Sequence, residues 1–281
     1  MIKFKKKGDN MERIAIISDI HANITALEAV VKDIEKRNIK RIICLGDIIG
    51  KGASPAKCID IIREKCEVVL QGNWEEEVGW YEAENNEDER ERVNWNRDKI
   101  GEDRFNYIKN LPLIHEMYVS GSLVRMFHLS PKSANSKERI MYKDKPIKKL
   151  EYFKASGDTS TKEADIVIYA DIHIQYMEKF YNKTLINTGS IGFNVDLIRD
   201  DENDSSYLET TKAHYCILEG EIGETEYKSE FSIQFVRVVY DIEKEIEIIN
   251  NKGVEKDEKY KYRLLEGRVG EKKIKKNLCE D

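Results

Sequence analysis

The stretch Ile14-Ala15-Ile16-Ile17-Ser18-Asp19-Ile20-His21 decides the fold, because four apolar residues are followed directly by a carboxylate and an imidazole. A short apolar run bounded in this way is typical of a buried strand in a parallel sheet. Similar runs occupy residues 42–45, 68–70, 123–127 and 166–169. We therefore predict a sheet system built on five buried strands.

Helical patterns alternate with the first three of these strands. Residues 24–37 carry apolar side chains at helical spacing, and the helix begins either at Asn23 or with a capping box made by Thr25 and Glu28. A second helix is predicted over residues 55–64. This alternation predicts a parallel α/β sheet with right-handed crossovers. Turn residues at 120–122 and 181–184 predict hairpins, so antiparallel strands should make the sheets mixed.

The chain has 281 residues, of which 40% are hydrophobic, and this is enough for a substantial core. We predict a single domain over residues 1–281 with its core at about residues 13–240. Residues 75–112 read as a helical cap insertion, and residues 75–104 within it hold 12 acidic and 5 basic side chains. Residues 241–281 read as a charged C-terminal extension.

Composition excludes several classes of protein. No apolar run approaches the roughly 18 residues of a membrane span, and the run at residues 14–17 is too short for a secretory signal, so we predict a cytoplasmic protein without a membrane partner. Five cysteines without a CxxC pair are predicted to be reduced thiols. A net charge of −6 argues against a partner made of long nucleic acid.

Potential metal ligands follow each of the five apolar strands. They are Asp19 with His21, Asp47 after Gly46, Asn73 after Gly72, His128, and Asp171 with His173. Each alone has an ordinary explanation as a turn residue. Because the carboxyl ends of parallel strands meet at one crevice, we expect all seven side chains to lie close together. This mixture of imidazole, carboxylate and amide suits two ions of Mn, Fe or Zn better than Mg or Ca.

In this order the residues resemble the DxH, GD, GN, H and GHxH pattern of the calcineurin-like metallophosphoesterases, over about residues 13–240. Ser18-Asp19-Ile20-His21-Ala22-Asn23, Leu45-Gly46-Asp47-Ile48, Gly72-Asn73-Trp74-Glu75 and the sequence NTGSIG at residues 187–192 are similar to a bacterial subgroup that includes asymmetric diadenosine tetraphosphate hydrolases. The resemblance implies an α/β fold, a four-layer α/β/β/α sandwich of two mixed sheets, here with the helical cap insertion.

The resemblance also implies the roles of the ligand residues. Asp19, His21 and His173 would bind one metal ion, and Asn73, His128 and Asp171 would bind the other. Asp47 would bridge both, and two divalent ions, with Mn foremost, would activate a water for attack on phosphorus. Asp47, Asn73 and His128 are accordingly the predicted catalytic residues.

The chain departs from the family pattern in its last motif, which reads Ala170-Asp171-Ile172-His173 instead of Gly-His-x-His. A carboxylate is shorter and harder than an imidazole and carries a negative charge, so it should change the affinity for the second ion and favour Mn-like ions. Two alternatives stay open, a working ligand at Asp171 and a weakened second metal site.

A second departure is Trp74, at a position where many relatives have a histidine that protonates the leaving group. Without such an acid, a weakly basic leaving group such as a nucleotide is favoured over a simple alkoxide. Trp74 is also a candidate for stacking on a nucleobase, although the tryptophans near it could equally form the core of the cap. Lys132, Lys137 and Arg139 are candidates for phosphate contacts.

The spacing of motif residues excludes two other functions, a nucleotide-binding glycine loop and a serine hydrolase. Gly50-Lys51-Gly52 lacks the spacing of a nucleotide-binding glycine loop, and Ser190 lacks the Gly-x-Ser-x-Gly elbow of a serine hydrolase. His115 and His214 lie outside any ligand pattern and are interpreted as structural.

The sequence therefore predicts a dinuclear metal-dependent phosphoesterase that cleaves a nucleotide phosphoanhydride or phosphodiester. Diadenosine tetraphosphate, cut asymmetrically to ATP and AMP, is the leading small-molecule substrate, and a homodimer is left open. One alternative is a metal-weakened scaffold that binds a protein partner, as a retromer subunit of this fold does. Another is a cyclic nucleotide phosphodiesterase or nuclease that uses the same metals.

Overall fold

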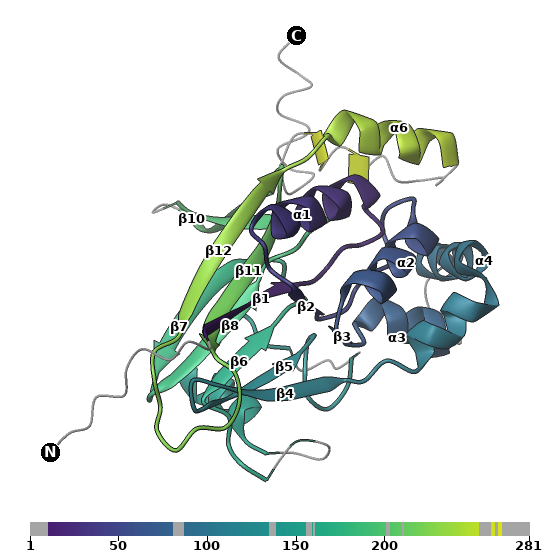
Figure 1. Cartoon of the computed structure of the whole chain (residues 1–281). Coiled ribbons are helices and arrows are strands. Elements are labelled where there is room, and N and C mark those ends of the chain that lie inside the picture. The colour runs from purple at the N-terminus through teal and green to yellow at the C-terminus, as the bar shows by residue number, and fades with distance from the viewer. Residues whose placement is uncertain are drawn as a thin grey trace, which may run out of the picture.

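The computed structural model describes residues 11–80, 87–134, 139–155, 159, 161–200, 203–209, 211–252, 260, 261, 264 and 265. Its strands form two five-stranded sheets and one hairpin (Figure 1). The first sheet runs in the order β12 (Ser232–Val239), β11 (Lys212–Glu221), β1 (Met11–Ile17), β2 (Arg41–Cys44) and β3 (Val68–Val69). The second runs in the order β4 (Ile114–Val119), β5 (Ser122–Phe127), β6 (Ile166–Tyr169), β8 (Lys183–Thr188) and β7 (Gln175–Phe180).

Both sheets are mixed, as predicted. β1, β2 and β3 run parallel, and β11 and β12 add antiparallel strands at one side. β5, β6 and β8 run parallel, while β4 and β7 join them through hairpins. The five strands predicted from apolar runs correspond to β1, β2, β3, β5 and β6, with ends shifted by a few residues. The hairpin of β9 (Val195–Asp200) and β10 (Asn203–Glu209) was not predicted.

The two sheets pack face to face. Ile16 and Ile43 of the first sheet meet Val124 and Ile168 of the second in one buried apolar cluster. The alternation of side chains along each strand sends the neighbouring residues to the outer faces, where Ile17 belongs to a separate cluster. The core therefore consists of one layer between the sheets and one layer outside each sheet.

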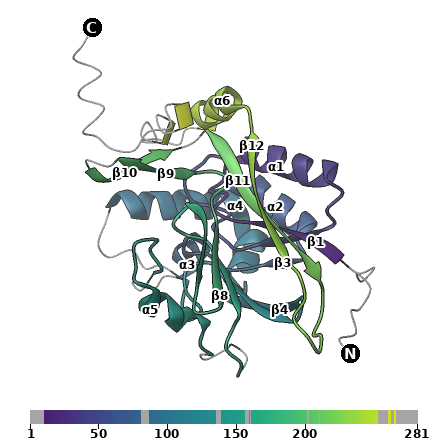
Figure 2. The same cartoon turned by 90° about the vertical axis from the view of Figure 1, so that its left-hand side faces the viewer.

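Helices cover both outer faces. α1 (Ile24–Lys36), α2 (Pro55–Lys65), α3 (Asn73–Trp80) and α4 (Glu87–Lys109) pack on the first sheet, and α6 (Ile242–Lys252) lies against α1 (Figure 1). The second sheet is covered by the short α5 (Pro146–Lys149) and the 3₁₀ helix η1 (Leu150–Phe153), on the opposite side of the strands from α1 (Figure 2). This is the predicted four-layer α/β/β/α sandwich.

Two local features of the fold bear on the site. Asn23, not Thr25, caps α1, because its side chain accepts a hydrogen bond from the backbone N–H of Ala26 at 3.0 Å, so the prediction of a Thr25 capping box is wrong. The hydroxyl and the backbone N–H of Thr25 instead donate to the buried Glu245 of α6. The C-terminal helix is thereby tied to the start of the helix that follows Asp19 and His21.

The predicted cap region contains α3 and α4, and α4 is interrupted at Gly101, which has a φ of +72°. Cys44, Cys58, Cys66 and Cys216 are free thiols, while Cys279 lies outside the described residues. Among the described residues, no helix combines the length and the apolarity that a membrane crossing requires.

Candidate metal centre

The predicted ligand residues follow strands of both sheets, and backbone hydrogen bonds join the loops that carry them. The loop after β1 carries Asp19 and His21, whose N–H groups donate to the carbonyls of Gly46 and Asp47 at 3.0 and 2.9 Å. Those residues belong to the loop after β2. In the second sheet the N–H of Ala170, after β6, donates to the carbonyl of His128, after β5. These bonds fix the loops of each sheet relative to one another.

Five of the predicted ligand residues have an unusual backbone conformation. Asp19, His21, Asp47, Asp171 and His173 have φ values of +51°, +51°, +52°, +67° and +61°. The left-handed region costs a non-glycine residue roughly 1–2 kcal/mol, so it persists only where the surrounding structure imposes it. The strain is concentrated at the residues predicted to bind metal.

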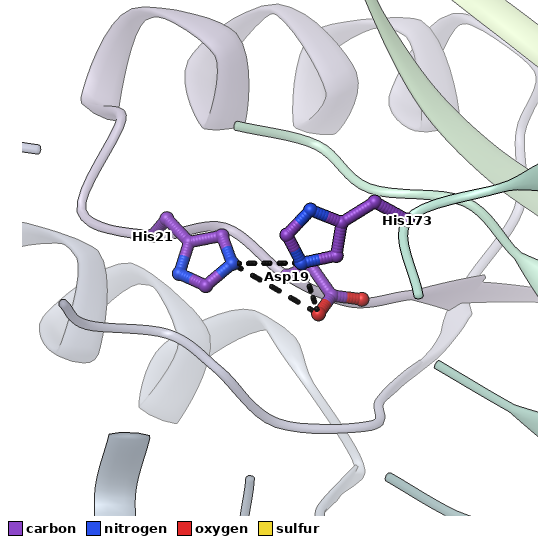
Figure 3. A group of neighbouring side chains, drawn as sticks. All are labelled: Asp19, His21 and His173. Carbon is purple, nitrogen blue, oxygen red and sulfur yellow. Dashed lines mark hydrogen bonds and ion pairs between the residues drawn. The ribbon is translucent and has the colours of Figure 1, made fainter. Parts of the chain in front are cut away.

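The first group of side chains joins Asp19 and His21 to His173, which is more than 150 residues away in sequence. The Nε2 atoms of the two histidines are 3.1 Å apart, and the Nε2 of His173 lies 3.2 Å from Oδ1 of Asp19 without hydrogen-bond geometry (Figure 3). Ligands about 2.1 Å from one ion lie roughly 3.0–3.4 Å apart in tetrahedral or octahedral geometry. Two of the three separations in this group fit the ligands of a single ion, while Oδ1 of Asp19 and Nε2 of His21 are farther apart, at 4.0 Å.

The second group consists of Asp47, Asn73 and His128. Nε2 of His128 lies 3.4 Å from Oδ1 of Asp47 and 3.2 Å from Oδ1 of Asn73. The other ring nitrogen of His128 is 3.1 Å from the carbonyl oxygen of Leu45. With Nδ1–H donating to that carbonyl, Nε2 presents its lone pair to the site.

The carboxylates connect the two groups. Oδ2 of Asp47 lies 3.8 Å from Nε2 of His21, while its Oδ1 faces His128. Oδ1 of Asp19 is likewise 4.0 Å from His21 and 3.9 Å from His128. Asp47 thus has one oxygen toward each group, which is the position that a bridging ligand needs.

The donor set fits divalent metal ions. Asp19, His21, Asp47 and His128 are at most 2% exposed, and neither carboxylate oxygen of Asp19 nor Nδ1 of His21 has a hydrogen-bond partner in the described structure. A buried carboxylate without partners is costly unless a cation neutralises it. A cation bound between the two groups would therefore stabilise these carboxylates.

The pKa values of Asp19, His21 and His128 are set by burial and by the charges of neighbouring side chains. Burial alone would lower the pKa of His128, but the Asp47 and Asp19 carboxylates raise it to about 10. Burial alone would raise the pKa of Asp19, but His173 and His128 lower it. Burial and the nearby ammonium of Lys51 lower the pKa of His21 well below its usual value. The carboxylates favour a cation beside them, and a protonated His128 supplies it when no metal ion does.

Asp171 lies beside these groups but pairs with Arg139. Its side chain is 5% exposed, and its Oδ2 is 3.3 Å from Nε of Arg139. Burial raises the pKa of Asp171, against the influence of His128 and Arg139. Asp171 is absent from both close groups of acidic and imidazole ligands among the described residues, so its predicted role as a ligand stays a prediction.

Of the predicted substrate-binding residues, Trp74 is buried, whereas Lys132 and Arg139 lie at the surface. Trp74 is 9% exposed and belongs to the core cluster, where its indole lies against Gly50. Little of its ring is therefore available for stacking. Lys132 is exposed in the loop after β5, Arg139 is half-exposed beside Asp171, and Lys137 lies outside the described residues.

Sequence reasoning missed the role of Glu75. This side chain is fully buried, and its Oε2 accepts hydrogen bonds from the N–H groups of Asp47 and Gly72 at 2.7 and 2.9 Å. Its Oε1 accepts from Ile48 at 2.8 Å and Ile49 at 3.3 Å. One carboxylate thus joins the Asp47 loop to the Asn73 loop. The available signal was its place at the third position of a helix that begins at Asn73, where a glutamate reaches back to the capping residue.

Comparison with known proteins identifies the family. The profile of the calcineurin-like phosphoesterase superfamily domain matches residues 12–213, which contain every predicted metal ligand. The chain belongs to this superfamily. An uncharacterized protein of Methanocaldococcus jannaschii is 31% identical to it over 245 residues, covering 85% of this chain and 93% of that protein.

Solved structures agree with the superfamily fold. A metallophosphoesterase from Sphaerobacter thermophilus matches with a TM-score of 0.65 and 21% identity, covering 92% of this chain and 100% of that chain. A hypothetical protein from Pyrococcus horikoshii matches with a TM-score of 0.71 and 16% identity, covering 92% and 99%. At these identities the likeness establishes the sandwich fold of this superfamily member, while its substrate has to be argued from the site.

Proposed function

We propose that this chain is a phosphoesterase that works with two divalent metal ions. The observation that carries the proposal is a buried cluster in which Asp19 and Asp47 lie among the imidazoles of His21, His128 and His173, and in which both carboxylate oxygens of Asp19 lack a hydrogen-bond partner in the described structure. Membership of a phosphoesterase superfamily gives that cluster its expected chemistry.

The two groups assign ligands to the ions. Asp19, His21 and His173 would hold one, and Asn73 and His128 the other, with Asp171 within reach and Asp47 between them. When bound, the ions would acidify a water and neutralise charge on the phosphoryl oxygens. Imidazoles mixed with oxygen ligands favour Mn, Fe or Zn, and a carboxylate at position 171 in place of the family's imidazole favours Mn among these.

The chain's own residues do the remaining work. His128 is oriented by the contact of its Nδ1 with the Leu45 carbonyl, so its Nε2 is held toward Asp47 and Asn73. Burial of Asp19 and Asp47 keeps bulk water from screening the charges that meet a phosphoryl group. The backbone bonds to Glu75 keep the Asp47 and Asn73 loops in fixed positions.

A nucleotide phosphoanhydride is the substrate bond that this site favours. Trp74 stands where a proton donor would be needed and is buried, and Glu75 is occupied by backbone N–H groups. A leaving group that is already a weak base, such as a nucleotide, needs no such donor. Diadenosine tetraphosphate cut to ATP and AMP remains the leading substrate, on the sequence similarity of the motifs.

The test is hydrolysis by metal-stripped protein that is resupplied with Mn²⁺, with the products separated by chromatography. Chelator-sensitive release of ATP and AMP from diadenosine tetraphosphate supports the proposal in full, whereas two ADP would contradict the asymmetric cut. Asp47→Asn should lose the activity, and Asp98→Asn, an exposed change on α4, should retain it. Cleavage of simple sugar phosphates in preference to nucleotides would contradict the argument from the missing acid.

The pair formed by Asp171 and Arg139 favours a second candidate, a protein-binding scaffold with a weakened second metal site. An arginine at 3.3 Å competes with a metal ion for the same carboxylate. Absence of cleavage with any nucleotide, cyclic nucleotides included, together with one bound ion or none, would favour the scaffold. Restoring the family pattern with Ala170→Gly and Asp171→His should then increase metal binding.

A further inference from the structure

Lys51 lies in a turn that is bonded to the metal centre. The N–H of Gly52 donates to the carbonyl of His21 at 2.6 Å. On the other side, the buried Asn96 of α4 bonds both polar groups of the Gly50 backbone, accepting from its N–H at 3.2 Å and donating to its carbonyl at 3.1 Å. The backbone on both sides of Lys51 is therefore fixed relative to His21.

Neither neighbour of Lys51 can carry a side chain. A Cβ at Gly50, which has a φ of +121°, would lie 2.5 Å from the Trp74 ring. A Cβ at Gly52 would lie 2.7 Å from the carbonyl oxygen of Ala22. These close approaches explain the sequence Gly-Lys-Gly without any nucleotide-binding loop, and they leave Lys51 as the side chain that the turn presents.

An aromatic pair positions the side chain of Lys51. Its Nζ lies 3.8 Å from the centroid of the Phe193 ring, a cation–π contact. The Phe193 ring stands nearly perpendicular to the ring of His173 at 5.3 Å and to that of His21 at 6.1 Å. Tyr260 stacks on Phe193 at 5.9 Å and donates its hydroxyl to the Gly192 carbonyl. The ammonium is thus placed one ring away from two predicted metal ligands.

A fixed ammonium at this position is unfavourable for the bare metal centre. Its charge would repel a metal ion held by His21 and His173, because the ammonium contacts the Phe193 ring, which itself lies 6.1 and 5.3 Å from the rings of these two residues. An anion that lies between Lys51 and the ions removes the conflict, because it is attracted by both. Lysine binds phosphate as a flexible point charge, and the half-buried side chain can still be reached by a ligand.

We propose that Lys51 binds a phosphate group adjacent to the one that is cleaved, so that the site selects substrates with a polyphosphate chain. The proposal rests on the phosphoesterase function above, since it places the cleaved phosphate at the metal centre. Phe193 is a positioning residue that holds the ammonium, and Tyr260 supports Phe193. A single-phosphate ester would use the metal ligands alone.

The experiment compares ADP with AMP, which differ by one phosphate, as ligands of the Mn²⁺-saturated protein in titration calorimetry. The wild type should bind ADP more tightly than AMP. Lys51→Gln should weaken ADP binding by about tenfold or more and AMP binding by less than about twofold. Lys51→Arg should restore part of the preference, and Phe193→Leu should reduce it. Lys109→Gln, which removes a similar contact with the Trp80 ring at 3.9 Å, is the matched control and should change neither affinity.

Equal loss of ADP and AMP binding in Lys51→Gln, or no loss of either, would overturn the proposal. Hydrolysis of bis(p-nitrophenyl) phosphate, which has one phosphate, separates the two claims. If the wild type cleaves it and Lys51→Gln cleaves it at a rate within about threefold, the metal centre works independently of Lys51. A wild type that cleaves neither this ester nor diadenosine tetraphosphate, but whose ADP preference is lost in Lys51→Gln, would contradict the phosphoesterase function and support the polyphosphate site.

Discussion

Glu75 shows how one buried side chain can determine the shape of a site without touching a substrate. Its carboxylate accepts backbone N–H groups from both the Asp47 loop and the start of α3. Hydrogen bonds to a charged acceptor are stronger than neutral ones, and a buried donor that loses its partner is costly. The position of Asp47 between the two ligand groups depends on these bonds.

Glu75→Gln tests this role. Glutamine keeps one oxygen as an acceptor but replaces the other oxygen with an NH₂ group. This NH₂ group would face backbone N–H donors and could not accept their hydrogen bonds. We expect the free energy of unfolding to fall by about 2–3 kcal/mol, measured by urea denaturation, with weaker Mn²⁺ binding. An exposed control in the neighbouring helix, Glu102→Gln of α4, should change neither quantity. Unchanged stability in Glu75→Gln would contradict the role.

His214 is the second informative residue. It is fully buried in β11, and neither ring nitrogen has a hydrogen-bond partner in the described structure. Burial, together with Arg237 and Lys212, lowers its pKa to about 3. Both histidines interpreted as structural, His115 and His214, lie outside the two ligand groups.

Because the pKa of His214 is lower in the folded protein than in the unfolded chain, the unfolded chain binds more protons below about pH 6.5. The folded state therefore loses stability as the pH falls from 6.5 toward 3. Between pH 7.5 and pH 5 the wild type should lose about 2 kcal/mol more than His214→Leu does. Urea denaturation of both proteins at both pH values measures this difference. Equal losses would show that His214 does not carry the effect.

The sequence indicates which residues meet in the buried cluster better than it indicates which residues support that cluster. Asp19, Asp47 and His128 could be named because each follows an apolar strand, and the geometry of a sheet brings strand ends together. Glu75 accepts a hydrogen bond from Asp47, 28 residues earlier in the chain, and Lys51 contacts the ring of Phe193. Both contacts join residues that are distant in sequence, so no local pattern predicts them. The burial of Trp74 depends in the same way on the absence of a side chain at Gly50.

At the scale of elements, Arg125 connects the second sheet to its outer layer. The side chain is fully buried in β5, and its guanidinium donates to Glu116 of β4 and to the carbonyls of Phe153, Lys154 and Lys162. Within the described part of the chain, the helices of this layer are the short α5 and η1, so apolar packing alone supports it weakly. The arginine thus joins β5 to the end of η1 and to the segment after it, where the Phe153 carbonyl also accepts a hydrogen bond from the N–H of Ala164.

Arg125→Met should lower the free energy of unfolding by about 3–5 kcal/mol, because it removes the ion pair with Glu116 and the hydrogen bonds to the carbonyls of Lys154 and Lys162. Arg125→Lys keeps the charge but not the planar guanidinium, so its free energy of unfolding should lie between those of the wild type and Arg125→Met. Chemical denaturation measures the change. A loss below about 1 kcal/mol for Arg125→Met would show that η1 is held by its apolar contacts.

At the scale of the molecule, the C-terminal segment packs against the first ligand loop. The Tyr260 hydroxyl donates to the Gly192 carbonyl and lies 3.3 Å from the amide nitrogen of Asn23, 237 residues earlier in the chain. Glu245 bonds Thr25 in the same region. The predicted charged extension is thus in part a support of the site, which its composition did not indicate, because only the folded chain brings these residues together.

Tyr260→Ala should therefore affect both stability and the site. Loss of the buried ring should cost about 3–5 kcal/mol of unfolding free energy, and Phe193 should lose its stacking partner. Tyr260→Phe keeps the ring and should cost only about 1 kcal/mol. Urea denaturation combined with the ADP titration separates the two effects. A full ADP preference in a folded Tyr260→Ala protein would show that Phe193 needs no support from the C-terminal segment.

The central claim is that the buried cluster binds two divalent ions through Asp19, Asp47, Asn73 and the histidines. The most direct test is equilibrium dialysis of metal-stripped protein against Mn²⁺, followed by elemental analysis of the wild type and of Asp47→Asn. We predict two ions per chain in the wild type and fewer than two in Asp47→Asn, since Asp47 lies between the two ligand groups. Fewer than two ions in the wild type, or two ions in both proteins, would contradict the account.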